Sequence, residues 1–232
     1  VACLVGSEMC IRDRYMIKKK KKLALFDLDD TLFDGDTEGE WVTFMHKNGF
    51  IEDSSFFKEM EKFEKNYREG ILNVYDYSEF LLSPLTGVHL SEIKEDINNF
   101  TTDISERLTD NLTEELLEQH KHDAKILTSG SLSFLVTEIG KKLGIKTCFG
   151  TDPEYIDNIF TGKVCGKPNF SEEKVRRVIE WIGSENFDEI SAYSDSIHDL
   201  PLLEFSDKPH AISPDKKLNL IALERDWIIR VR

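Results

Sequence analysis

The stretch FDLDDTLFDGD at residues 26–36 places five aspartates within eleven positions, directly behind the apolar run at 23–26. A short apolar run that ends in turn residues is typical of a buried β-strand. Carboxylates this close together repel one another, and removing water from them at the end of a core strand is costly. The sequence therefore predicts that positive charge, from elsewhere in the chain or from a metal ion, lies among these aspartates.

The composition is that of a globular protein, with 232 residues, 40% of them hydrophobic, and a net charge of −14. The negative excess argues against a nucleic-acid backbone or an anionic membrane as the main partner. No apolar stretch approaches the roughly 18 residues of a membrane span. A small phosphorylated metabolite is compatible with the charge, because local positive charge can override the global sign.

The first fifteen residues differ from the rest of the chain. EMCIRDR, residues 8–14, matches the translation of a transposon end used in sequencing libraries, so we interpret residues 1–15 as a non-native artefact and expect the native start at Met16. Without this segment the remaining cysteines are Cys148 and Cys165, which are too far apart for a paired metal motif. We expect both to be buried, reduced thiols in a cytoplasmic protein.

Several short apolar runs predict buried strands, and helical patterns lie between them. The expected strands cover 23–26, 124–128, 146–149, 189–193 and 227–231. Apolar residues recur at helical spacing over 132–143 and again over 175–182. Strands that alternate with helices predict an α/β fold with a doubly wound parallel sheet.

Residues 37–118 interrupt this alternation. Their apolar residues recur at helical spacing, as in Phe56, Met60 and Phe63, and no segment has a strand pattern. We therefore expect an inserted all-helical cap domain over 37–118, and a core domain formed by 16–36 together with 119–232.

Residues directly after the strands are the candidate site, because ligands of open parallel sheets bind beyond the carboxyl ends of the strands. The sequence places carboxylates and hydroxyls there, after three different strands: Asp27, Asp29 and Thr31; Ser129 and Gly130; Asp195 and Asp199. Carboxylate oxygens suit Mg²⁺, while a Ser hydroxyl and a Lys ammonium suit phosphate oxygens. One carboxylate could attack phosphorus while a neighbour moves a proton.

These segments resemble the four motifs of the haloacid dehalogenase superfamily of phosphohydrolases. The motifs are DLDDTL at 27–32, ILTSGS at 126–131, a lysine on a later helix, and SDSIHD at 194–199. The helical insertion after the first motif resembles that of the phosphoserine-phosphatase-like subgroup, subfamily IB, some of whose members dephosphorylate histidinol phosphate. The resemblance extends over nearly all of residues 22–232 and implies a Rossmann-like core with a C1-type cap.

The resemblance also implies roles for individual residues. Asp27 would be the nucleophile that forms an aspartyl-phosphate, and Asp29 the acid that protonates the leaving oxygen and then activates water. Mg²⁺ would be held by Asp27, Asp195 and the Asp29 carbonyl, with Asp199 orienting metal-bound water. The phosphate-binding set would be Thr31, which supports the loop, together with Ser129, Gly130 and Lys174.

Some alternatives stay open. GKP at 166–168 resembles the lysine motif of other branches of the superfamily, so Lys167 competes with Lys174, which we favour because an amphipathic helix fixes its direction. His198 stands where the subgroup usually has Asn. We expect His120 and His122, in QHKHD, to face solvent.

The expected function is a Mg²⁺-dependent phosphatase for a small phosphate monoester of the phosphoserine or histidinol phosphate type. A phosphotransferase or mutase, or a non-catalytic binding protein of the same fold, is the alternative. Asp36, at the junction of core and cap, is the residue that we expect to meet an amine at the far end of the substrate. Glu38 and Glu40 have a competing explanation as first-turn acids that complement a helix dipole.

Overall fold

A six-stranded parallel sheet forms the centre of the molecule. The computed structural model describes residues 20–232; the interpretation of residues 1–15 and the expected start at Met16 lie outside the described residues. The sheet has the order β3-β2-β1-β6-β7-β8, and every neighbouring pair is parallel. Its strands are β1 (Lys22–Phe26), β2 (Ala124–Leu132), β3 (Thr147–Thr151), β6 (Glu189–Ser194), β7 (Lys208–Ile212) and β8 (Ile228–Arg230).

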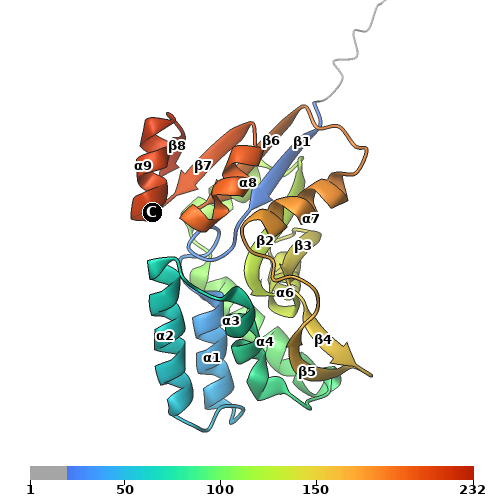
Figure 1. Cartoon of the computed structure of the whole chain (residues 1–232). Coiled ribbons are helices and arrows are strands. Elements are labelled where there is room, and N and C mark those ends of the chain that lie inside the picture. The colour runs from blue at the N-terminus through green and yellow to red at the C-terminus, as the bar shows by residue number, and fades with distance from the viewer. Residues whose placement is uncertain (1–19) are drawn as a thin grey trace, which may run out of the picture.

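The sheet extends from β1 in both directions, which is the doubly wound arrangement that the sequence predicts. Helices cover both faces (Figure 1). The core helices are α6 (Ser133–Lys142), α7 (Glu172–Ile182), α8 (Leu200–Phe205) and α9 (Lys216–Glu224), with a short 3₁₀ helix η2 (Ile197–Asp199) before α8. The expected α/β fold is thus confirmed.

The register of β1 brings the candidate residues to one edge. Phe26 pairs with Leu127 of β2 on one side and with Tyr193 of β6 on the other. Because all three strands are parallel, the residues that follow these partners lie toward the same end of the sheet. β2 continues to Leu132, however, so Ser129 and Gly130 lie within this strand and not directly after it, as the expected strand over 124–128 required. Asp27, whose amide donates to the Tyr193 carbonyl at 3.0 Å, is the first residue beyond β1.

Residues 37–119 are helical, apart from turns. They form α1 (Thr37–Lys47), α2 (Ser55–Glu69), α3 (Val74–Leu82), the 3₁₀ helix η1 (Ser83–Leu85), α4 (Leu90–Leu108) and α5 (Asn111–Gln119). Helices α1 to α4 lie at the end of the sheet where β1 finishes (Figure 1). Local signals set their ends: Asp36 caps the start of α1, and Gly70 ends α2 with the left-handed backbone (φ 76°) that glycine adopts easily.

An antiparallel hairpin was not predicted. It consists of β4 (Pro153–Ile156) and β5 (Ile159–Val164). Phe160 exchanges backbone hydrogen bonds with the segment between η1 and α4, through Gly87 and Val88, at 2.9 and 3.0 Å. The hairpin emerges from the core but packs against the inserted helices, so its strands have no partner in the main sheet.

One apolar cluster runs from the sheet into the inserted helices. It joins Phe26 of β1 and Leu135 of α6 to Trp41 of α1 and Phe100 of α4, all of them less than 3% exposed. Trp41 contacts Phe100 edge-to-face, with ring centroids 5.0 Å apart. A second cluster lies on the opposite face of the sheet, where Val178, Leu202 and Leu218 of the helices belong to the same cluster as Leu23 and Leu25 of β1. The inserted helices are therefore built onto the core.

Some expectations for single residues were wrong. His120 is buried, because at the end of α5 its ring packs against the rings of Phe26 and Tyr193. Its Nε2 lies 2.7 Å from the Tyr193 hydroxyl and its Nδ1 lies 2.8 Å from Asp123 Oδ2. His122 is exposed, as expected. Cys165 is exposed, because it follows the unpredicted β5, and Cys148 is half-buried. Within residues 20–232, no helix is both long and apolar enough to span a bilayer.

Candidate active site

A cavity of about 390 Å³ lies between the carboxyl end of the sheet and helices α2 and α3. The core contributes Asp29, Lys174 and Asp195 to its lining, and the inserted helices contribute Tyr67, Arg68 and Tyr77. Asp27 does not line the cavity; it is 6% exposed and contacts Lys174, which does. The edge of the sheet chosen from the sequence is thus the edge that faces a cavity.

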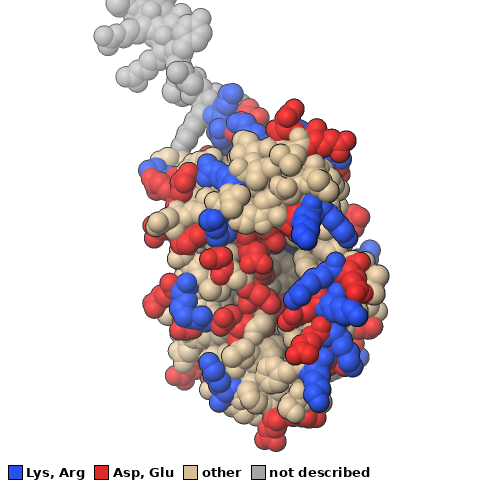
Figure 2. All heavy atoms as spheres, turned by 90° about the vertical axis from the view of Figure 1, so that its left-hand side faces the viewer, with Lys and Arg blue, Asp and Glu red and all other residues tan. Residues whose placement is uncertain are grey.

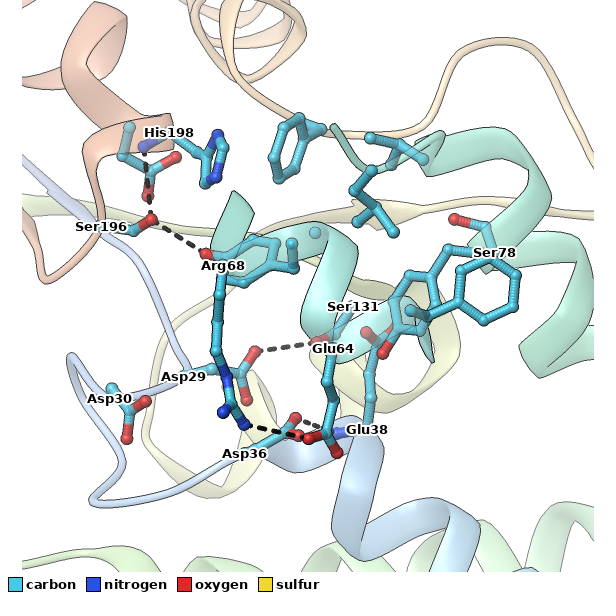
Figure 3. Close-up of a pocket in the computed structure, with 18 of the residues that line it drawn as sticks. Asp29, Asp30, Asp36, Glu38, Glu64, Arg68, Ser78, Ser131, Ser196 and His198 are labelled. Carbon is cyan, nitrogen blue, oxygen red and sulfur yellow. Dashed lines mark hydrogen bonds and ion pairs between the residues drawn. The ribbon is translucent and has the colours of Figure 1, made fainter. Parts of the chain in front are cut away.

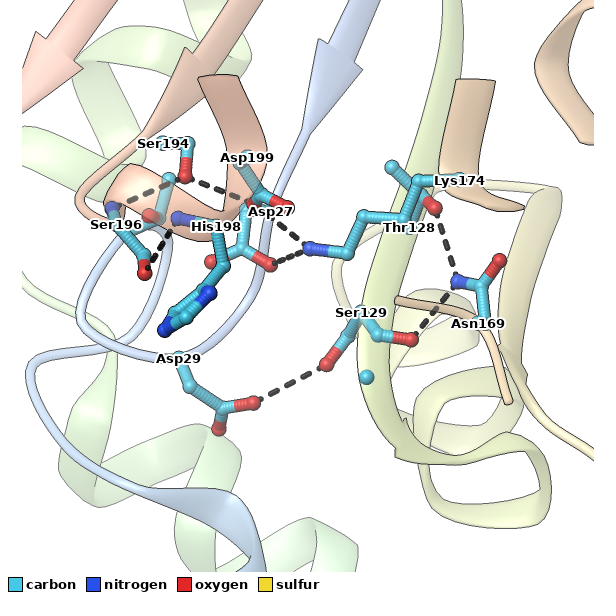
Figure 4. A network of polar contacts seen from close by, with 12 residues as sticks. Asp27, Asp29, Thr128, Ser129, Asn169, Lys174, Ser194, Ser196, His198 and Asp199 are labelled. Atoms are coloured by element: carbon cyan, nitrogen blue, oxygen red, sulfur yellow. Dashed lines mark hydrogen bonds and ion pairs between the residues drawn. The ribbon is translucent and has the colours of Figure 1, made fainter. Parts of the chain in front are cut away.

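Lys174 joins two of the predicted acids. Its Nζ donates to Asp27 Oδ1 at 2.8 Å and to Asp199 Oδ2 at 2.7 Å, and the lysine is only 3% exposed (Figure 4). Lys174 lies in the first turn of α7, whose apolar face packs on the sheet and directs the side chain toward β1. Asp199 also accepts a hydrogen bond from Ser194 Oγ at 2.8 Å. The positive charge that the aspartates require therefore comes in part from this lysine.

The carboxylates at the strand ends are poorly compensated in spite of Lys174. Burial raises the pKa of Asp27 to about 7, since it outweighs the attraction of Lys174 and is reinforced by Asp199 and Asp29. Burial and the charges of Asp27 and Asp199 raise the pKa of Asp195 to about 9. Burial also disfavours the charged form of Lys174, but Asp199 and Asp27 together raise the pKa of that lysine above its usual value. The site favours a further cation.

Asp29 is held by hydroxyls from β2. Its Oδ2 accepts hydrogen bonds from Ser131 Oγ at 2.8 Å and Ser129 Oγ at 3.1 Å, and its Oδ1 accepts the Thr37 amide at 2.7 Å. The two serines lie on the same side of the chain because side chains alternate along a strand. Ser129 thus contacts the predicted acid and base Asp29; it is 1% exposed and does not line the cavity.

Thr31 and Gly130 take different positions. Thr31 is fully buried; its hydroxyl donates to Asp195 Oδ1 at 3.2 Å and accepts the Asp195 amide at 3.0 Å. It therefore supports Asp195 and does not line the cavity. Gly130 lines the cavity directly.

The GKPN segment contributes a buried amide, while its lysine stays outside. Lys167 is exposed, whereas Asn169 is fully buried and donates to Thr128 Oγ1 at 3.0 Å and to the Ser129 carbonyl at 2.8 Å. Asn169 thereby fixes the part of β2 that contains Ser129 (Figure 4). The placement of the two lysines favours Lys174 as the phosphate lysine.

Asp36 and Glu38 lie together at the cap side of the cavity (Figure 3). Asp36 Oδ1 accepts the Glu38 amide at 2.9 Å, so this carboxylate caps α1. Asp36 keeps an exposed surface, yet burial raises its pKa to about 6, with Asp29 as the next cause. Burial, Asp36 and Asp29 raise the pKa of the half-buried Glu38 well above its usual value. Glu38 and Glu40 do lie in the first turn of α1, as their dipole explanation requires.

An aromatic contact links helix α2 to the core across the cavity. The Tyr67 hydroxyl lies 2.9 Å from Ser196 Oγ, and its ring lies 4.8 Å from the ring of His198. His198 also contacts Phe170, with ring centroids 5.0 Å apart. The amide of His198 donates to Ser196 Oγ at 3.3 Å. His198 is thus part of the cavity wall, where it packs between two aromatic rings.

Acids dominate the cavity. Seven acidic and two basic side chains line it, and Figure 2 shows acidic side chains gathered around a hollow on this face. Within the described residues, no three His, Cys, Asp or Glu side chains are grouped closely enough to hold a metal by themselves. The predicted magnesium set needs only the Asp27 and Asp195 carboxylates, with the Asp29 carbonyl as a third oxygen. Two desolvated carboxylates with raised pKa values fit this hard cation.

Sequence reasoning missed several residues that line or support the site. Ser131 could have been found, because it stands two positions after Ser129 on the same strand and so shares its face. Tyr67, Phe170 and Asn169 reach the site only through tertiary contacts, for which the sequence carries no short-range signal.

Comparison with known proteins gives concordant matches. A family model described as haloacid dehalogenase-like hydrolase matches residues 24–204. A histidinol-phosphatase of Neisseria meningitidis is 29% identical over 215 residues, which cover 89% of this chain and 97% of that protein. The phosphoserine phosphatase SerB1 of Mycobacterium tuberculosis is 29% identical over 223 residues, covering 89% of this chain and 70% of that protein.

Solved structures agree with this fold. A protein of unknown function from Bordetella pertussis superposes with a TM-score of 0.82 at 30% identity, covering 90% of this chain and 98% of that one. A phosphoserine phosphatase solved as an analogue of its phospho-aspartyl intermediate gives a TM-score of 0.63 at 22% identity, covering 92% and 94% of the two chains. At this identity, the match to the phosphoserine phosphatase shows a shared fold and no more.

Proposed function

The chain belongs to the haloacid dehalogenase-like hydrolase family, and we propose that it is a phosphatase that hydrolyses a small phosphate monoester through an aspartyl-phosphate on Asp27. The family match bears out the resemblance inferred from the four sequence motifs. The observation that carries the proposal is the placement of Asp27 at the carboxyl end of the central strand β1. There Lys174 binds it, and Asp29 lies two residues further along the chain, in the cavity lining.

Asp27 is suited to act as the nucleophile. One of its oxygens, Oδ1, is bound by Lys174. An attack of the carboxylate on phosphorus forms the acyl-phosphate and releases the alcohol of the substrate. Lys174 would then neutralise part of the charge on the transferring phosphoryl group, which is the main electrostatic demand of phosphoryl transfer.

Asp29 is suited to move the proton. The leaving alkoxide of an alkyl phosphate needs a proton, and the carboxyl group of Asp29 can supply it and then take one from the attacking water. Ser129, Ser131 and the Thr37 amide fix the direction of this carboxyl group. Such fixation places the proton at a defined distance from the leaving oxygen without reorganisation during the reaction.

We further propose Mg²⁺ as the cofactor. Asp27, Asp195 and the Asp29 carbonyl would hold it, Asp199 would orient its bound water, and Thr31 would keep Asp195 in place. When bound, Mg²⁺ supplies positive charge to the phosphate oxygens.

The far end of the substrate is proposed to carry an amine or an imidazole. Asp36 and Glu38 lie on the side of the cavity that the inserted helices form, and the aromatic rings of Tyr67, Tyr77 and Phe170 lie along its wall. An ammonium or imidazolium group gains from carboxylates in a water-poor cleft more than it would in bulk solvent. Phosphoserine and histidinol phosphate have this combination of charges, whereas sugar phosphates lack the cation.

The test is a screen of phosphorylated metabolites for phosphate release with Mg²⁺. Asp27→Asn should abolish turnover, because an amide cannot form the acyl-phosphate, and EDTA should abolish turnover of the unchanged chain. Asp34→Asn is a matched control, since Asp34 is an exposed acid of the same loop. Turnover that persists in EDTA, or in the Asp27 variant, would contradict the mechanism.

A second comparison tests the amine. We expect Asp36→Asn to lower kcat/KM for amine-bearing phosphates more than for neutral ones. An equal loss for both classes, or a preference of the unchanged chain for sugar phosphates, would contradict amine recognition without contradicting the phosphatase. Stoichiometric phosphate release with water as acceptor separates hydrolysis from transfer to another alcohol.

A further inference from the structure

The guanidinium of Arg232 binds the loop that carries the candidate catalytic acids. It donates to the backbone carbonyls of three consecutive residues: Asp30 at 3.2 Å, Thr31 at 2.8 Å and Leu32 at 3.0 Å. The side chain of Arg232 is 11% exposed. Figure 1 marks this end of the chain near the loops that connect the core to the inserted helices.

The same guanidinium binds the returning connection. Its Nε donates to Asp110 Oδ2 at 2.8 Å, and one of its terminal nitrogens lies 3.4 Å from Thr113 Oγ1. The two connections also meet directly, since the Asp34 amide donates to the Leu108 carbonyl at 3.1 Å. Arg232 therefore lies where the chain leaves the core after β1 and where it returns before α5.

Within residues 20–232, the Thr31 carbonyl has Arg232 as its hydrogen-bond donor and no other. The loop's own backbone bonds are short-range, such as the Asp30 amide to the Gly35 carbonyl at 3.1 Å. Removing the only donor of a buried carbonyl destabilises the folded state. Hydrogen bonds from charged donors are stronger than those from neutral donors. The permanently charged guanidinium of arginine presents five N–H donors in a fixed, planar fork, whereas lysine has three donors on a single nitrogen and cannot reproduce this geometry.

Thr31 connects this contact to the site. Its carbonyl binds Arg232, while its hydroxyl binds the Asp195 side chain. Asp29 lies two residues before Thr31 in the same loop. A shift of the backbone at Thr31 would therefore move both Asp29 and the support of Asp195.

We propose that Arg232 is a positioning residue that fixes the backbone of the loop over residues 28–32, and with it the placement of Asp29 opposite the leaving oxygen of the substrate. This inference rests on the proposed phosphatase function, because it assigns the consequence of the contact to proton transfer. It needs no contact between Arg232 and substrate.

Substrates with different leaving groups test the proposal. The leaving group of an alkyl phosphate is a strongly basic alkoxide, which needs the proton of Asp29 to depart, whereas that of p-nitrophenyl phosphate is a stabilised phenolate, which does not. Hydrolysis of the aspartyl-phosphate is the same step for both substrates, so the two differ only in the steps up to release of the leaving group. Arg232→Ala should lower kcat/KM, which reports the steps up to release of the leaving group, by about 10²-fold for the alkyl substrate, the usual cost of a displaced catalytic group. It should lower kcat/KM for the aryl substrate far less, and guanidinium at millimolar concentration should restore part of the alkyl rate.

Arg230→Ala is the matched control. Arg230 lies on the same strand end and binds Glu115 of α5 at 3.0 Å, without a contact to the loop. This variant should leave both rates unchanged. Arg232→Lys keeps the positive charge but not the planar guanidinium, and its rates on both substrates should resemble those of Arg232→Ala. If the alanine variant fails to fold, the lysine variant tests the proposal in its place.

Hydrogen exchange of the Asp30 and Phe33 amides provides a readout that does not require activity. Exchange should accelerate in both Arg232 variants and stay unchanged in Arg230→Ala. Equal losses for alkyl and aryl phosphates, a lysine variant with unchanged kinetics, or unchanged exchange would overturn the proposal. If the unchanged chain hydrolyses no phosphate ester, the proposed function fails, and faster exchange would still support the positioning of the loop.

Discussion

Replacing Lys174 with alanine would leave the carboxylates of Asp27 and Asp199 buried without their shared lysine. The lysine Nζ lies 2.8 and 2.7 Å from their oxygens, and the three side chains are between 4% and 8% exposed. Removing one partner of such a buried pair costs roughly 3–5 kcal/mol of unfolding free energy. For a chain of this size that corresponds to a drop in Tm of about 10 °C.

Activity should fall for a related reason. The attraction of Lys174 opposes the rise in the pKa of Asp27, so its loss favours the protonated acid, which is a poor nucleophile. The variant also lacks a charged contact to the phosphoryl group, worth about 2–4 kcal/mol, or roughly 30- to 1000-fold in kcat/KM.

Lys167→Ala is the control for both measurements, since this exposed lysine belongs to the competing motif. It should change neither Tm by calorimetry nor kcat/KM for the substrate found in the screen. If Lys167→Ala costs more activity than Lys174→Ala, or if Lys174→Ala keeps both Tm and rate, the assignment of the phosphate lysine is wrong.

Two further perturbations test other parts of the structure. Burial, and then the charges of Arg230 and His120, lower the pKa of His210 to about 4. The unfolded chain takes up that proton near pH 6.5 and the folded chain only near pH 4, so unfolding free energy should decrease by up to roughly 3 kcal/mol between these values as pH falls. His210→Phe should therefore show a smaller loss of Tm from pH 7 to pH 4.5; an equal loss would refute the assignment. Tyr67→Phe removes the hydroxyl bound to Ser196 and should raise KM about fivefold with little change in kcat, following the usual value of about 1 kcal/mol for a hydrogen bond. Tyr75→Phe, at an exposed tyrosine of α3, is its control and should leave KM unchanged; similar effects of both would exclude a role for the α2 contact.

The sequence was informative wherever a local pattern coincided with strand topology. The apolar runs of β1, β2 and β6 can be recognised in the sequence, and the carboxyl ends of parallel strands lie at the same edge, so the sequence predicts that Asp27, Ser129 and Asp195 lie near one another. The four motifs then allowed the family to be recognised, and the family match confirmed it.

What sequence reasoning missed depends on distant contacts. β7 has the sequence KPHAI, in which lysine, proline and histidine interrupt the apolar pattern that would predict a buried strand. The hairpin β4–β5 pairs with a segment about seventy residues earlier in the chain, and Arg232 binds carbonyls 200 residues or more away. The boundaries of the inserted helical segment, 37–118, stay a prediction.

The shared apolar cluster has a consequence for how the molecule unfolds. One cluster contains Phe26 of β1, Leu135 of α6, and Trp41 and Phe100 of the inserted helices. Unfolding the insertion would therefore expose apolar side chains of the core domain. The insertion and the core should accordingly lose structure in one cooperative calorimetric transition, and the isolated segment 37–118 should not fold. Opening to admit a substrate is then restricted to helical segments outside this cluster, chiefly the part of α2 after Met60 and the start of α3. An enzyme built in this way exchanges its substrate by a small local movement, while most of the insertion stays as rigid as the sheet.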